Sequence, residues 1–201
     1  MKSLSSILSA IVLSLATMAF AQSDPQKSDA HKHEAQPPQA PRSESQKSFE
    51  KLKTLAGDWE GPVTVQPRVP EMEDGGKPMH VSMRVTSMGH LLMHEMNSEG
   101  RPDDPITTIY LDGDQLLLTH YCDAGNRPRM AAKTSPDGKT VEFDFVDITG
   151  NTQYGHMQHA LFTAIDDNHH TEEWTFLLPG DKPMHAHFDL QRVGTGKTNG
   201  R

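Results

Sequence analysis

The stretch Leu55-Ala56-Gly57-Asp58-Trp59-Glu60-Gly61 decides how this chain folds. Before it, Phe49, Leu52 and Leu55 recur at helical spacing. Within it, Gly57 can supply the left-handed residue with which a helix ends. After it, the sequence changes to short alternating segments. The stretch therefore marks the place where a short closing helix passes into the first strand of a β-sheet.

The sequence from Asp58 to Val193 predicts ten short strands separated by turns. Asp112-Gly113 and Asp137-Gly138 are typical of tight hairpin turns, which require positive φ. The predicted strands are 58–66, 79–88, 90–98, 105–112, 115–122, 128–135, 139–147, 155–166, 169–178 and 184–193. A meander of this kind must close or cover its edges. The predicted fold is therefore all-β, an antiparallel up-and-down barrel of about ten strands with one short N-terminal closing helix.

Two predicted strands are apolar on both faces. They contain Leu91-Leu92-Met93 and Leu116-Leu117-Leu118. In a simple barrel one face of each strand meets water, so these strands predict cover by the helix, by the segment before it, or by a second copy in a homodimer.

Residues 1–21 have the pattern of a signal peptide. Lys2 precedes an apolar run from Leu4 to Phe20, and Ala19-Phe20-Ala21 is a cleavage pattern. The run is about 17 residues long and contains Ser and Thr, which disfavours the alternative of a permanent membrane anchor. We expect export to the bacterial periplasm or beyond it, with no membrane span after processing.

The folded domain is expected to cover 48–193. Residues 22–47 are rich in Pro, Ser, Gln and charged side chains and predict a disordered polar linker. Ser48 can cap the first turn of the helix, and residues 194–201 are expected to form a disordered tail. Cys122 is the single cysteine, so the chain forms no internal disulfide.

The predicted domain is strongly acidic. Residues 48–193 contain 12 Lys and Arg against 23 Asp and Glu, a formal balance of −11. Such a surface repels nucleic-acid phosphates and anionic membranes. We therefore expect nucleic acid not to be a partner.

The start and the end of the predicted domain resemble the calycin superfamily. In lipocalins a Gly-x-Trp opens the first strand, and an Arg of the last strand packs across that Trp. Gly57, Trp59 and Arg192 occupy the matching positions. The resemblance covers about 48–193 and implies a barrel with an internal cavity, in which Gly57, Trp59, Gly61 and Arg192 have structural roles.

The wider pattern Leu52-x-x-Leu55-x-Gly57-x-Trp59-x-Gly61 is more similar to nitrobindin-like barrels and to a bacterial lipocalin-like family of unknown function. Nitrobindins bind haem through a histidine in the C-terminal part of the barrel. His185 and His187 lie in that part of this chain, but neither can be aligned with that ligand. The disulfides of lipocalins are missing.

The hairpin around residue 124 carries the densest group of polar side chains. His120 and Cys122 share one face of a strand because they are two residues apart, and Tyr121 points to the other face. Arg127 and Arg129 share a face of the next strand, where guanidinium groups suit a carboxylate ligand at a barrel mouth. The predicted ligand contacts are His120, Tyr121, Cys122, Arg127 and Arg129. The alternative is a hairpin that satisfies its own backbone, with Cys122 as a small buried apolar side chain.

A second group of candidates consists of histidines. His156 and His159 lie on one predicted strand, and His185 and His187 share a face of the last. Imidazoles two residues apart on a strand can ligate one metal ion. These four predict a haem or transition-metal site, with surface histidines on an acidic protein as the alternative.

Catalysis has less support than binding. The sequence contains no Gly-x-Ser-x-Gly, His-Glu-x-x-His or Gly-x-Gly-x-x-Gly motif. Cys122 and His120 could serve as nucleophile and base, but no third group orients them. The leading prediction is an exported barrel that binds a small, mostly apolar ligand without catalysis. The alternatives are the haem- or metal-binding barrel and a non-binding structural or interaction module, which an exposed patch of Leu91, Leu92, Leu116 and Leu117 would favour.

Overall fold

The computed structural model describes residues 41–68, 77–98, 104–134 and 138–194. The predicted signal peptide and most of the predicted linker and C-terminal tail lie outside these residues. The described elements are α1 (Glu44–Lys53), β1 (Gly57–Gly61), β2 (Val63–Gln66), β3 (Met79–Thr86), the 3-10 turn η1 (Ser87–Gly89), β4 (Leu91–Ser98), β5 (Ile106–Asp112), β6 (Gln115–Tyr121), β7 (Asn126–Thr134), β8 (Thr140–Gly150), β9 (His156–Asp166), β10 (His169–Leu178) and β11 (Lys182–Arg192).

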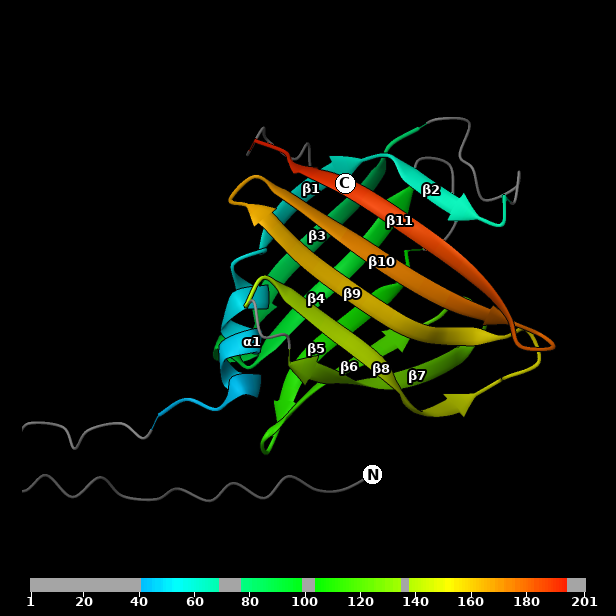
Figure 1. The fold of residues 1–201 in the computed structure, drawn as a ribbon, viewed down its shortest axis with the longest axis horizontal. Helices are drawn as coiled ribbons and strands as arrows, with labels where there is room; N and C mark the ends of the chain where they lie inside the picture. Colours follow the sequence, from blue (N-terminus) through cyan, green and yellow to red (C-terminus); the bar gives the residue numbers. More distant parts are fainter. Residues whose placement is uncertain (1–40, 69–76, 99–103, 135–137, 195–201) are drawn as a thin grey trace, which may run out of the picture. The chain divides into compact units, whose positions relative to one another are not determined.

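The strands form one closed antiparallel barrel (Figure 1). From β3 to β11 each strand pairs with the next along the chain, and β1 pairs with both β3 and β11. Both β1 and β2 pair with β11, and only Pro62 separates them. They are therefore one bent strand, interrupted where proline lacks a backbone N–H. The predicted fold, a barrel of ten strands with one short helix, is confirmed.

The helix begins earlier than the sequence predicted. Ser43, not Ser48, is its N-cap: Gln46 N–H donates to Ser43 Oγ at 3.2 Å, and Ser43 N–H donates to the Gln46 side chain at 2.9 Å. This reciprocal capping box satisfies the backbone N–H groups of Ser43 and Gln46 and so starts the helix before Ser48. Four residues expected in the linker are consequently helical.

The helix closes one end of the barrel. It contacts β5, β6 and β7, and Figure 1 shows it beside the end at which β1 begins. Phe49, Leu52 and Leu55 are buried in the same apolar core as the inward side chains of the strands. We call this the closed end, and the opposite end, where β2 ends and β3 begins, the open end. No described helix has the length and apolar character needed to cross a bilayer.

The strands that are apolar on both faces do not present an exposed patch. Leu92 and Leu116 are fully buried in the core, Leu117 is 4 % exposed and Leu91 is half-buried. These four leucines therefore do not form the exposed patch that would favour a non-binding structural or interaction module.

Candidate functional site

A cavity of about 250 Å³ lies inside the open end of the barrel. Four methionines contribute to its wall, one from each of β3, β4, β9 and β11. The side chains lining it are Val63, Val65, Met79, Met96, Pro105, His120, Cys122, Asp123, Met157, Trp174, Phe176, Leu178, Met184, Ala186 and Phe188. Because methionine is flexible and polarisable, such a wall can adjust to the shape of what it encloses. The cavity is thus mainly apolar, with its polar groups gathered at the end of β6.

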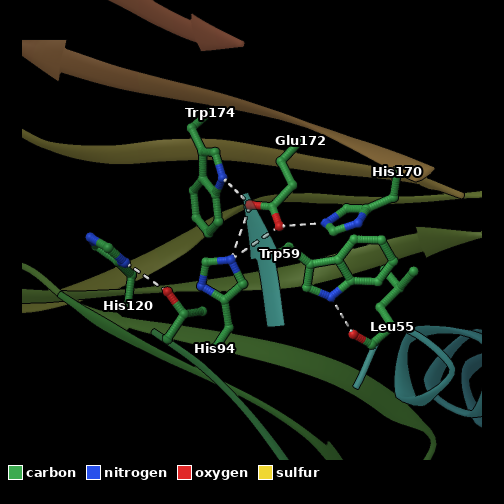
Figure 2. Close-up of polar contacts among 8 residues, drawn as sticks. Leu55, Trp59, His94, His120, His170, Glu172 and Trp174 are labelled. Carbon is green, nitrogen blue, oxygen red and sulfur yellow. Dashed lines mark hydrogen bonds and ion pairs between the residues drawn. The ribbon is translucent and has the colours of Figure 1, made fainter. Parts of the chain in front are cut away.

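A buried polar cluster lies between this cavity and the closed end. On β10, alternate side chains face inward, which places His170, Glu172 and Trp174 inside the barrel. We define the Glu172 cluster as these three residues and His94 of β4. Figure 2 shows the other three side chains directed at the Glu172 carboxylate.

Glu172 accepts all the hydrogen bonds of this cluster. His94 Nε2 lies 3.1 and 3.0 Å from its two oxygens, and His170 Nε2 lies 3.0 Å from Oε1. The Trp174 indole N–H donates to Oε2 at 2.9 Å. The Nδ1 atoms of both histidines are buried and have no partner among the described residues. Each imidazole therefore directs its hydrogen bonding to this one carboxylate.

The charge of Glu172 follows from these contacts. Burial by itself raises the pKa of the carboxyl, but the adjacent His94 and the hydrogen bonds from His170 and His94 outweigh it and hold the pKa of Glu172 well below its usual value. A buried charge is tolerated only when it is paired and hydrogen-bonded. The cluster meets that requirement for a carboxylate.

His120 connects the cluster with the cavity. His94, Thr107 and His120 are cross-strand neighbours on β4, β5 and β6 and form an inward-facing row. Thr107 Oγ1 lies 2.8 Å from His120 Nδ1, and Trp174 lies 5.7 Å from both imidazole rings. Nε2 of His120 has no hydrogen-bond partner among the residues described. It is the ring nitrogen available to a ligand.

His120 is a neutral imidazole at physiological pH. Its pKa is lowered from 6.5 to about 4, chiefly by burial and secondly by the nearby His94, while Asp123 at the cavity mouth acts in the opposite direction. The cavity thus contains a hydrogen-bonding group that is uncharged and held in place by Thr107.

The closed end is built around Trp59. Its ring is 1 % exposed, its indole N–H donates to Leu55 O at 2.8 Å, and it meets His170 edge-to-face at 4.2 Å. The Arg192 guanidinium lies 4.1 Å from the centre of the Trp59 ring and donates to Ala56 O at 2.8 Å. Gly57 has a φ of 144°, which residues with a Cβ rarely adopt, and a Cβ there would lie 2.3 Å from that guanidinium, so glycine is favoured at this position.

Of the five predicted ligand contacts, two line the cavity. These are His120 and Cys122. Tyr121 points the other way and is 47 % exposed. Its orientation follows from the alternation of the strand.

The two predicted arginines lie on the outer face of β7. Arg127 Nε donates to Thr149 Oγ1 at 3.3 Å, and Arg129 Nε donates to Asp147 Oδ1 at 3.1 Å. Asn126, Pro128 and Met130, which alternate with them, are buried. The structure therefore does not bring a guanidinium from this hairpin into the cavity, and contact of these arginines with a ligand stays a prediction.

The four histidines predicted as metal ligands lie on the outer face of β9 and β11, and none lines the cavity. Their inward neighbours on the last strand are Met184, Ala186 and Phe188. The hydrogen-bond partners of His156, His159, His185 and His187 are, in order, Gln158, Asp144, Thr175 and Glu173. These four imidazoles do not meet inside the barrel.

One of the four takes part in a small surface group of metal-ligand type. Among the described residues, only Glu142, Asp144 and His159 bring three such atoms within 4.8 Å of one another. Lys133 forms a hydrogen-bonded ion pair with Asp144, and this contact holds the pKa of the Asp144 carboxyl below its usual value. The ammonium group already supplies the positive charge that a metal ion would supply.

Sequence reasoning missed His94, Thr107, His170, Glu172 and Trp174. A signal was present: 169–175 is polar on both faces and contains one of the two tryptophans. Polar residues on alternate positions normally indicate the solvent face, so period alone assigns His170 and Glu172 to the outside. The burial of Glu172 depends on pairing with His94, 78 positions away along the chain, which a single sequence does not reveal.

Comparison with known proteins identifies the fold. No protein-family model matches the chain, and no curated protein matches it. Among solved structures, Rv2717c from M. tuberculosis is similar with a TM-score of 0.50 at 14 % identity, over 73 % of this chain and 98 % of that one. A protein of unknown function from the DUF3598 family of Nostoc punctiforme gives a TM-score of 0.46 at 14 % identity, over 71 % of this chain and 49 % of its own. The likeness to Rv2717c is one of fold: a ten-stranded antiparallel barrel.

Proposed function

We propose that this barrel binds a small, mostly apolar ligand in the cavity at its open end and does not transform it chemically. The observation that carries the proposal is the cavity of about 250 Å³, with four methionine side chains in its wall and one neutral imidazole. Binding sites for small molecules are typically concave and apolar, with a few placed polar groups.

The size of the cavity limits the ligand. Its volume equals that of roughly eight molecules of liquid water at about 30 Å³ each, which is just below the usual range for ligand sites. A short aliphatic chain or a single substituted ring fits this volume. The flexible methionines allow the wall to adapt to either.

We further infer that the chain is a lipocalin-like member of the calycin superfamily. Gly57-x-Trp59 at the start of β1, and Arg192 across the Trp59 ring, support this assignment together with the closed ten-stranded barrel.

We also propose that the protein is exported. The apolar run Leu4–Phe20 and the pattern before Gln22 support cleavage after Ala21. Intact mass measurement on protein from the exported fraction of its host tests this: a chain that begins at Gln22 is expected, and a chain that retains Met1 or Lys2 contradicts it.

Native mass spectrometry tests the binding function. Protein purified from its own host without denaturation is expected to carry a bound small molecule that organic solvent releases. Ala186 lines the cavity, so Ala186→Leu fills part of it and is expected to lower the bound fraction at least severalfold. His185→Leu, on the outer face of the same strand, is the matched control. If wild-type protein purified from its host carries no bound small molecule, so that its bound fraction equals that of Ala186→Leu, the proposal is wrong.

A further inference from the structure

We propose that the ligand of this cavity is uncharged and carries one hydrogen-bonding group, such as an alcohol, a phenol or a ketone, which contacts Nε2 of His120. The inference rests on the proposed function and narrows it to a chemical class. It excludes carboxylates, the ligand class that Arg127 and Arg129 of the same hairpin suggested in the sequence.

The charges around the cavity oppose an anion. No lysine or arginine is found among its described lining residues, whereas Asp123 lies at its mouth. The anionic Glu172 lies next to Trp174, which forms part of the wall. Arg127 and Arg129 are directed outward and hydrogen-bonded to Thr149 and Asp147. A carboxylate placed here would lose its hydration without gaining a cation, and that loss is costly.

A purely apolar ligand is also a poor match. His120 is 2 % exposed and lies in the lining with Nδ1 already bound by Thr107. An alkane packed against this imidazole would bury Nε2 without a hydrogen bond, and leaving a buried polar group unpaired costs more than forming the bond gains. A ligand with one polar group at this depth removes that cost.

Because of its hydrogen bond with Thr107, Nε2 of His120 can act either as a donor or as an acceptor toward a ligand. A threonine hydroxyl can donate or accept. When it donates to Nδ1, Nε2 carries the proton and donates to a ketone; when it accepts from Nδ1–H, Nε2 accepts from a hydroxyl. A neutral imidazole with this partner therefore favours uncharged ligands, and it does not select between a hydrogen-bond donor and an acceptor.

Three probes of matched size test the inference: 1-hexanol, hexanoate and heptane, each titrated calorimetrically into the full protein at pH 7. Wild type is expected to bind 1-hexanol at least tenfold more tightly than hexanoate. His120→Leu is expected to weaken 1-hexanol about tenfold, and heptane is expected to bind at least as tightly as to wild type, because no unpaired Nε2 is then buried against it. His120→Gln, which keeps a donor and an acceptor, is expected to restore most of the 1-hexanol affinity. His185→Leu is the outer-face control.

The outcomes separate this inference from the proposed function. If heptane binds but hexanoate binds as tightly as 1-hexanol, the uncharged class is wrong and the binding function stands. Equal loss of heptane and 1-hexanol in His120→Leu overturns the contact with Nε2. If none of the three probes binds wild type, both the function and the inference are wrong. Should His120→Leu fail to fold, the ratio of 1-hexanol to hexanoate affinity in wild type still decides the question of charge.

Discussion

Glu172 is completely buried, and side chains from β4 and β10 converge on its carboxylate. A buried ion pair does not by itself add stability, because desolvation of both partners offsets their attraction. Removing one partner is different, since it leaves the other groups without compensation. His94, His170 and the Trp174 indole all depend on this acceptor.

Glu172→Gln is expected to lower the free energy of unfolding by about 3–5 kcal/mol, because it removes the charge to which two imidazoles and an indole are bonded. Urea unfolding at pH 7 measures the loss. Glu173→Gln is the control, since Glu173 lies on the outer face beside His187. A loss below about 1 kcal/mol would contradict the central role of the carboxylate.

The same substitution has a signature in acid. The pKa of Glu172 is lower in the folded state than the usual value of about 4.3. Its stabilisation is therefore fully present above that value and is lost as pH falls from about 4 through the folded-state pKa. Glu172→Gln is expected to flatten the decline of stability below pH 4, measured by urea unfolding at successive pH values. An unchanged decline would show that the carboxyl is not anionic in the folded state.

The burial of His120 gives the free energy of unfolding a second, separate dependence on pH. Its pKa is about 4 in the folded protein, against the ordinary value of 6.5 that applies to the unfolded chain. Between these values the unfolded chain binds a proton that the folded chain does not, so stability falls as pH drops from 6.5 to 4, by about 3 kcal/mol in total. Above 6.5 the group contributes no slope. His120→Gln is expected to remove this component in the range pH 4–6.5, and a retained component would place its origin elsewhere.

Helix α1 differs from its predicted form at its first turn. The sequence indicates the apolar stripe of Phe49, Leu52 and Leu55 because three-residue spacing is visible in any short helix. The start was harder to place because both Ser43 and Ser48 are acceptable caps. The capping box with Gln46 decides between them.

Paired serine substitutions test this start. Ser43→Ala removes the side-chain acceptor of the Gln46 N–H and is expected to cost about 1 kcal/mol in urea unfolding. Ser48→Ala lies inside the helix, where alanine has the higher propensity, so it is expected to be neutral or slightly stabilising. The reverse order of the two effects would place the start of the helix at the later serine.

The barrel as a closed body depends on the seam between β1 and β11. A Cβ on Gly61 would lie 1.8 Å from the backbone oxygen of Asp189. The backbone of Asp189 cannot move aside as the end of a flexible side chain can, so the pairing of β1 with β11 would have to shift. This glycine permits the first strand to bend at Pro62 and remain paired with the last.

Gly61→Ala is expected to destabilise the protein by about 1–3 kcal/mol or more, the usual cost of inserting atoms into a packed region. Urea unfolding measures the change. Gly194→Ala is the control, because its Cβ would meet nothing within 4 Å and its φ does not require glycine. A cost for Gly61→Ala no larger than that of the control would show that the seam is looser than described.

The barrel and its seam were largely predictable from the sequence, and the polar interior was not. Alternation such as Val81, Met83 and Val85 and the turn pairs near 113 and 138 carry strand positions locally, and the observed strand ends differ from the predicted ones by three residues at most. The Arg192–Trp59 contact was predictable from a family pattern. The meeting of His94 with Glu172 depends on tertiary pairing across the barrel, and the outward turn of Arg129 depends on strand register, neither of which local period reveals.

The seam also has a consequence for the order in which the chain folds. β1 has its final partner only when β11 exists, and the register joins residues 59 and 192. A pairing between residues so far apart forms slowly, because the loop between them must close before the contact is gained. A chain delivered N-terminus first would carry β1 as an edge strand, paired with β3 on one side only, until its last strand emerged. In Trp174→Phe protein, Trp59 is the single indole fluorophore, and its signal would time the closure.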